Sequence, residues 1–160
     1  MAIESYTLHT AESKWCEALT ELINAGFIRT ESHLLKHNRT DVEEVGKYLA
    51  SSTGGDGAAN NTGSSQFLMC ASENEANPSP VAVIRLDIPS LPSDAGMTDR
   101  VAMFGMLAVH PSHEKKGLAK WLIEEAEHRA LAAGCSAMAM HLPAVRKDMA
   151  RYYTKLGYVH

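Results

Sequence analysis

Hydrophobic positions in the second half of the chain alternate between a strand-like run and helical spacing. Val101 to Val109 (VAMFGMLAV) is almost continuously apolar, which is typical of a central strand covered on both faces. Lys116 to Ala133 then has apolar residues at helical spacing, and Gly134 stands where a C′ glycine is expected. Ala137 to Leu142 is a second apolar strand. The pattern predicts a strand–helix–strand unit with parallel strands.

Two further runs precede this unit and predict an antiparallel hairpin. They are Gln66 to Ala71 (QFLMCA) and Val81 to Ile88 (VAVIRLDI), and a polar, proline-containing segment joins them. Ile3 to Leu8 is expected to form a short edge strand. A sheet with both antiparallel and parallel pairs, together with its helices, predicts the α/β class.

Three more segments have helical features. Lys14 to Asn24 carries apolar residues at helical spacing, and Gly26 is expected to stop this helix. A second helix should begin near Thr40, because Thr40 to Glu43 has the form of a capping box. The expected apolar stripe of this helix is Val42, Val45 and Leu49. A last helix is predicted over Arg146 to Leu156.

The length favours a single domain covering residues 1–160, since 160 residues suffice for one full core but are few for two. Residues 51–65 (SSTGGDGAANNTGSS) are rich in Gly, Ser and Asn and predict a mobile loop inside that domain. The hydrophobic content of 45% and charged content of 21% are ordinary for a soluble globular protein.

Charge and cysteine usage exclude several classes of function. The formal net charge of −4 offers no general attraction to nucleic acid or to an anionic membrane, so any anion site must be local. No stretch is long and apolar enough to span a bilayer, and no signal-peptide pattern is visible. The three cysteines lack the spacing of a zinc site or disulfide framework, which favours a cytoplasmic protein without a metal.

The turn from Val109 to Lys120 (VHPSHEKKGLAK) is a candidate anion site. It leads from the buried strand into the long helix, and the small residues Gly117 and Ala119 would let a ligand approach the backbone. Free N–H groups and the dipole at a helix start favour anions, and three lysines add positive charge. From the turn alone, a pyrophosphate cradle and an ordinary strand-to-helix turn with solvated lysines are equally good interpretations.

Two motifs make the chain resemble the GNAT superfamily of N-acetyltransferases. Val109 to Ala119 is similar to the family's acetyl-coenzyme A signature, V-x-P-x(2)-[QR]-x-x-G-x-[GA]. Ala150 to Tyr158 (ARYYTKLGY) is similar to its C-terminal helix motif. Gly105 to Val109 (GMLAV) and Arg146 to Met149 (RKDM) also resemble a subgroup with GMLAV and R-x-E-L patterns. The resemblance is strong over residues 101–160 and extends to the first hundred residues only as an order of elements.

The resemblance implies a GNAT fold, a mixed sheet flanked by helices, that binds acetyl-CoA as co-substrate and acetylates a primary amine of a small molecule or peptide. The expected coenzyme-binding residues are Leu107, Ala108, Val109, Glu114, Lys115, Lys116, Gly117, Leu118, Ala119 and Lys120. Glu114 departs from the family pattern, which has Gln or Arg there, and a carboxylate beside a pyrophosphate is unfavourable.

By resemblance, Tyr153 is the general acid that protonates the departing thiolate, and the alternative is that it only packs in the apolar face of its helix. Tyr152 is expected in the core. No carboxylate lies on Val101 to Val109, where many relatives place a base. His141 and Asp87 are therefore candidate bases, Glu31 and His33 are others, and water alone could also remove the proton.

In this family the acceptor site is built mainly from the first two helices and their connection. Arg29 and His33 lie there, and Arg146 could contact an anionic acceptor or the coenzyme, unless it is only a surface cation. Relatives continue through a strand after the last helix, where this sequence stops at His160. Either that strand is missing, or a partner chain, as in a homodimer, completes the sheet. A catalytically weak acyl-CoA-binding module is the alternative function.

Overall fold

The computed structural model describes residues 2–31, 37–52, 65–73, 76, 78–89 and 99–159. Within them, the strands are β1 (Thr7–Thr10), β2 (Ser65–Ser72), β3 (Pro80–Ile88), β4 (Val101–Val109) and β5 (Ala137–Met140). The α-helices are α1 (Cys16–Glu31), α2 (Val42–Ser52), α3 (Leu118–Ala132) and α4 (Lys147–Lys155). Short 3₁₀ turns occupy Ala2–Ser5, Ser13–Trp15 and Pro111–His113.

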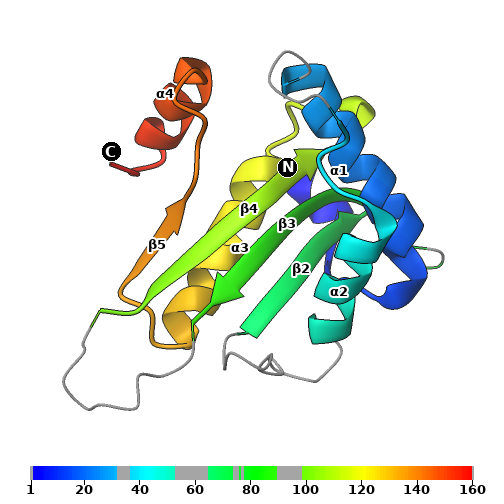
Figure 1. Cartoon of the computed structure of the whole chain (residues 1–160), viewed down its shortest axis with the longest axis horizontal. Helices are drawn as coiled ribbons and strands as arrows, with labels where there is room; N and C mark the ends of the chain where they lie inside the picture. Colours follow the sequence, from blue (N-terminus) through cyan, green and yellow to red (C-terminus); the bar gives the residue numbers. More distant parts are fainter. Residues whose placement is uncertain are drawn as a thin grey trace.

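The described strands form one mixed sheet in the order β1-β2-β3-β4-β5. The first four strands pair antiparallel and β4 pairs with β5 in parallel. The expected hairpin and the expected parallel unit are therefore confirmed, and so is the α/β class. Figure 1 shows α1 and α2 on one face of the sheet and α3 on the other.

Alternating side chains of β3 and β4 give each face its own hydrophobic core. Ile84, Leu86 and Phe104 pack with buried residues of α3 and α4, whereas Val83 and Ala108 pack with α1 and α2. Fully buried large side chains in these two cores include Leu19, Ile23, Leu49, Leu118 and Leu122. The two-layered core fixes the positions of α1, α3 and α4 around the end of β4.

A bulge interrupts β4 at Met106, whose backbone is left-handed with φ 50°. The register with β3 shifts there, because Val83 is opposite Ala108 while Arg85 is opposite Gly105. The extra residue turns Ala108 toward α1, although Phe104 four residues earlier faces α3. β5 pairs with β4 only over 101–104, so residues 105–109 have no neighbour on that side among the described strands.

Helix α1 corrects the prediction that Gly26 stops the first helix. α1 continues through Gly26 to Glu31. A Cβ added at Gly26 would lie 3.1 Å from Cβ of Ala108, so this glycine allows the helix to approach β4 closely. The sequence was right that a glycine is needed at position 26. The reason is the close packing of the helix on β4, and not a helix end.

The remaining boundaries differ in smaller ways. Residues 2–5 form a 3₁₀ turn, and the predicted Ile3–Leu8 strand is replaced by β1 at Thr7–Thr10. Asp41 caps α2, because its Oδ1 accepts a 2.8 Å hydrogen bond from the backbone N–H of Glu44, so the N-cap lies one residue later than predicted. Val42 is consequently 50% exposed and does not join the core.

The predicted loop over residues 51–65 is shorter at both ends, since 51 and 52 belong to α2 and 65 to β2. Residues 53–64 lie outside the described residues, so the mobility of this loop stays a prediction. At the end of α3, Gly134 adopts φ 81° as expected of C′, and Cys135 donates from its backbone N–H to Ala130 O at 2.9 Å.

Candidate active site

A cavity of about 550 Å³ lies where β4 continues without β5. Its walls come from the end of β4, the turn into α3, the inner side of α1 and one side of α4. The lining residues are Gly26, Phe27, Leu107, Ala108, Val109, His113, Glu114, Lys115, Gly117, Leu118, Ala119, Lys120, Arg146, Met149, Tyr152 and Tyr153. The structure therefore brings the predicted coenzyme turn and the predicted acid Tyr153 together in one cavity.

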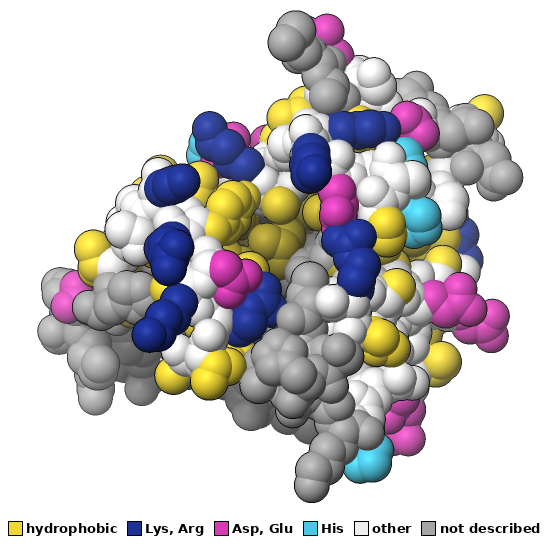
Figure 2. All heavy atoms as spheres, turned by 90° about the horizontal axis from the view of Figure 1, so that it is seen from above, with side chains coloured by type: hydrophobic (Ala, Val, Ile, Leu, Met, Phe, Trp, Pro, Cys, Tyr) yellow, Lys and Arg dark blue, Asp and Glu magenta, His cyan; other side chains and the backbone are white. Residues whose placement is uncertain are grey.

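The turn into α3 presents unpaired backbone donors to this cavity. Lys115 and Gly117 have left-handed backbones, with φ 60° and 85°, and Gly117 is the N-cap of α3. Within the described part of the chain, no backbone carbonyl accepts a hydrogen bond from the N–H groups of residues 115–120. Such a turn at a helix N-terminus is a suitable anion site. Figure 2 shows a hollow at this end of the molecule with a hydrophobic floor and Lys and Arg around its rim.

Of the ten residues predicted to bind coenzyme, all but Lys116 line the cavity. The Nζ of Lys116 instead donates to the hydroxyl of Tyr6 at 3.3 Å. That hydroxyl also lies 2.8 Å from Nδ1 of His113. Because an ammonium group can only donate, the Tyr6 hydroxyl accepts from Lys116 and donates its own proton to His113. Nδ1 of His113 therefore carries no proton, and the imidazole ring is neutral. Burial lowers the pKa of His113, in agreement with this neutral form. Lys116 thus ties the turn to the N-terminal segment.

Glu114 forms an ion pair with Arg29 of α1. Arg29 was predicted on the acceptor side, and the structure places its guanidinium at the coenzyme turn. The side chains are 49% exposed for Arg29 and 34% exposed for Glu114. The carboxylate that departs from the family motif therefore has a specific cationic partner, contributed by a distant part of the chain.

Tyr153 is 4% exposed and packs edge-on against the rings of Phe104 and Tyr158. Burial raises the pKa of Tyr153 to about 12, so its phenol is protonated at neutral pH. Among the described residues, the structure gives the Tyr153 hydroxyl no hydrogen-bond partner, which leaves it available to a ligand. The prediction that Tyr152 lies in the core is wrong, because Tyr152 is 37% exposed.

Arg146 is the N-cap of α4 and is only 9% exposed, so it is not an ordinary surface cation. Its guanidinium donates to both carboxylate oxygens of Asp148, each at 3.0 Å. These hydrogen bonds lower the pKa of Asp148 to about 2. Sequence reasoning did not single out Asp148, although its spacing of two residues from an arginine at a helix start is a signal for this pairing.

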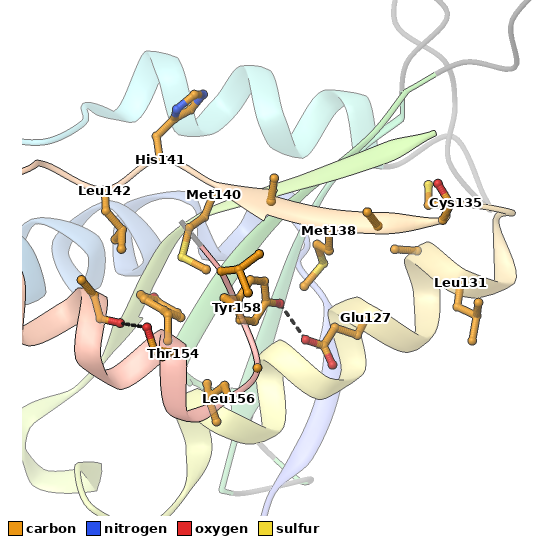
Figure 3. A pocket seen from close by; sticks show the side chains of 18 residues that line it. Glu127, Leu131, Cys135, Met138, Met140, His141, Leu142, Thr154, Leu156 and Tyr158 are labelled. Carbon is orange, nitrogen blue, oxygen red and sulfur yellow. Dashed lines mark hydrogen bonds between the residues drawn. The ribbon is translucent and has the colours of Figure 1, made fainter. Parts of the chain in front are cut away.

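Of the candidate bases, Asp87 and His141 do not line the cavity. Asp87 is on the face of β3 that carries α1 and α2, where it pairs with Arg85 at 2.9 Å. Burial raises the pKa of Asp87 more than this arginine lowers it, and Oδ1 of the carboxylate is buried without a partner among the described residues. His141 is exposed and points away from the neighbouring Leu142 and Met140 (Figure 3). His33 lies outside the described residues.

A second, larger cavity of about 760 Å³ lies under β5, between the end of α3 and α4. Its lining is mostly apolar and includes the side chains of Met138, Met140 and Leu156 (Figure 3). The hydroxyl of Tyr158 donates to Glu127 at 2.6 Å across it. Tyr153 lines this cavity as well as the first. No pattern in the sequence indicates this second cavity.

Several residues of the first cavity were also missed. Gly26, Phe27, His113 and Met149 line it but were not predicted as site residues. A glycine inside a helical pattern was the available signal for Gly26, and the position of His113 inside the coenzyme signature was a signal for that residue. Nothing in the sequence distinguishes Phe27 and Met149 from ordinary core positions. Among the described residues, no three His, Cys, Asp or Glu side chains gather as metal ligands would. In the same residues, no helix is long and apolar enough to cross a membrane.

Comparison with known proteins agrees with this geometry. The sequence profile of the acetyltransferase (GNAT) family matches residues 28–158. The chain therefore belongs to the GNAT acetyltransferase family, whose members are acyltransferases. No curated protein matches the chain.

Solved structures show the same fold at low sequence identity. An acetyltransferase from Trypanosoma brucei is 17% identical, with a TM-score of 0.66 over 97% of this chain and 93% of that one. Glucosamine-6-phosphate N-acetyltransferase from Arabidopsis thaliana is 15% identical, with a TM-score of 0.61 over 97% and 92%. An aminoglycoside acetyltransferase from an uncultured soil metagenomic sample, solved with trehalose, is 14% identical, with a TM-score of 0.64 over 97% and 89%.

Proposed function

We propose that this chain is an acetyl-CoA-dependent N-acetyltransferase that acetylates a primary amine of a small molecule or peptide by direct attack. One observation carries the proposal. The unpaired amides of the turn at Gly117 and the buried hydroxyl of Tyr153 line the same cavity. An anion site and a proton donor in one cavity are what a phosphate-bearing thioester requires.

The residues present suit this coenzyme. The amides of residues 115–120, with Lys115 and Lys120, would hold the pyrophosphate. The unpaired edge of β4 at Leu107 to Val109 would hydrogen-bond the amide-containing arm, and the apolar floor would accept its methylene groups. When bound, acetyl-CoA supplies the acetyl group as a thioester.

Transfer forms a C–N bond and breaks a C–S bond. A neutral amine attacks the carbonyl carbon, and a backbone N–H on the free edge of β4 would stabilise the resulting oxyanion. The proton on Tyr153 would pass to the departing sulfur, since its high pKa keeps the phenol protonated until a strong base forms beside it. The proton lost by the amine goes to water or to a base such as Asp87 or His141.

The acceptor would approach from the side of α1, whose residues Gly26 and Phe27 line the cavity. Arg146, which lines the cavity and is held by Asp148, is the predicted contact for an anionic group of either substrate. His33 stays a predicted acceptor contact. The solved relatives named for amino sugar and aminoglycoside acetylation make polar amines sensible first candidates.

The test is a screen of amines, including amino sugars, polyamines and peptides, for release of free CoA thiol. At least one amine should give saturable turnover, and Tyr153→Phe should lower kcat by about 100-fold while leaving the Kd of acetyl-CoA unchanged. Tyr152→Phe is the matched control, because Tyr152 lines the same cavity but is partly exposed. Equal kcat values for both variants would remove Tyr153 from the mechanism.

A single base can be sought in the same assay. If Asp87 or His141 takes the amine proton, Asp87→Asn or His141→Gln should lower kcat. The same variant should also shift the acidic limb of the pH profile of kcat. If both variants keep the wild-type pH profile, neither residue is the base, and Glu31, His33 or water takes that proton.

The second candidate function, a catalytically weak acyl-CoA-binding module, is favoured by Glu114, a carboxylate in the wall of the anion site. Tight binding of acetyl-CoA without turnover of any amine would select it.

A further inference from the structure

Glu114 is the one carboxylate among the described residues that line the 550 Å³ cavity. It stands in the turn whose free amides face that cavity, immediately before Lys115. An unpaired negative charge at this position would repel a polyphosphate. The turn can therefore bind such a ligand well only if the charge of Glu114 is compensated.

Arg29 provides that compensation from α1. It lies in the last turn of this helix, and its guanidinium NH2 group donates to Oε1 of Glu114. The inner side of the same helix already forms part of the cavity wall through Gly26 and Phe27. Arg29 thus contacts a residue of the cavity wall without lining the cavity itself, although 85 positions separate it from Glu114 in sequence.

We propose that Arg29 is a coenzyme-positioning residue: it neutralises Glu114, so that the free amides and lysines of the turn can bind the coenzyme's phosphates. This inference rests on the proposed function. It moves Arg29 from the acceptor side, where sequence reasoning placed it, to the coenzyme side. A merely structural ion pair between groups this exposed would contribute little to stability and nothing to ligand affinity.

The proposal predicts opposite effects for the two partners. Arg29→Ala leaves the carboxylate unpaired at the anion site, so the Kd of acetyl-CoA should rise about tenfold at low ionic strength. Glu114→Gln leaves the positive charge of Arg29 uncompensated beside the anion site, so Kd should fall several-fold. The double variant should return close to the wild-type Kd, and Arg29→Lys should keep most of the affinity because the charge is retained.

The measurement is calorimetric titration of each folded variant with acetyl-CoA at low and high salt. The differences between variants should shrink at about 1 M salt, where the screening length is about 3 Å. S-acetyl-pantetheine, which lacks the phosphates, should show the same KM for all variants as acetyl donor. The matched control is the pair of variants Lys47→Ala and Glu43→Gln. These two exposed residues of α2 form an ion pair, with 2.8 Å between Nζ of Lys47 and Oε1 of Glu43, and they line neither cavity.

The outcomes separate the two claims. If the wild type binds acetyl-CoA but Arg29→Ala and Glu114→Gln shift Kd in the same direction, or not at all, the inference is overturned and the proposed function stands. If Arg29→Ala instead raises the KM of the amine alone, Arg29 belongs to the acceptor site. If the wild type itself does not bind acetyl-CoA, both proposals fail.

Discussion

The two cavities that meet at Tyr153 differ more in chemistry than in size. The cavity under β5 is the larger, at about 760 Å³ against about 550 Å³, and its acidic lining residue Glu127 is already hydrogen-bonded to Tyr158. The smaller cavity contains the start of α3, whose amides have no backbone acceptor among the described residues. Unsatisfied donors, rather than empty volume, locate the proposed anion site. Three predictions follow that can separate the two cavities.

The largest effect is expected from matched substitutions of one glycine in each cavity. Gly117 and Gly157 have φ 85° and 98°, so Gly117→Val and Gly157→Val should each strain the backbone by about 1–2 kcal/mol. Only Gly117→Val should weaken acetyl-CoA binding, because displacing amides from a charged phosphate costs about 1.5–3 kcal/mol. Calorimetry and thermal melts measure the two effects. Equal affinities of the two variants would show that the turn at Gly117 does not hold the coenzyme.

A smaller effect is expected from the hydrogen bond inside the larger cavity. Tyr158→Phe removes the donor to Glu127 and should lower the free energy of unfolding by about 1 kcal/mol. The Kd of acetyl-CoA should not change, because Tyr158 does not line the smaller cavity. Denaturant unfolding and calorimetry test this pair of results. A marked loss of coenzyme affinity would mean that the larger cavity takes part in binding.

The smallest effect concerns the pH dependence of the residue shared by both cavities. With the pKa of Tyr153 raised to about 12, the acid form of the phenol is kept well above neutral pH. The kcat at saturating substrates should therefore not fall up to about pH 10, where an ordinary tyrosine would be half ionised. A decline with an apparent pKa near 10 that disappears in Tyr153→Phe would show that burial does not protect this proton.

The elements that follow simple periodicity could be predicted from the sequence. β4 begins and ends where its apolar run does, and the C′ position of Gly134 follows from local backbone preference. Both features depend on neighbouring residues alone. The free amides of the turn at Gly117 are likewise a direct consequence of starting a helix, whereas their predicted role in coenzyme binding came from the family resemblance.

The features that depend on tertiary contact could not be predicted. Gly26 signalled a helix end, but its role depends on Ala108, 82 positions away by number, whose Cβ would lie 3.1 Å from a Cβ added at Gly26. The bulge at Met106 has no composition signal, and the partner of Glu114 comes from α1. The burial of Arg146 likewise depends on where α4 packs.

The most direct test of the central claim is hydrogen–deuterium exchange of the wild-type protein with and without saturating acetyl-CoA. The account predicts slower exchange of the amides in residues 107–120, with no change in residues 137–140 and 156–159, which line only the larger cavity. Slower exchange in the second set without the first, or no change in either, would contradict it.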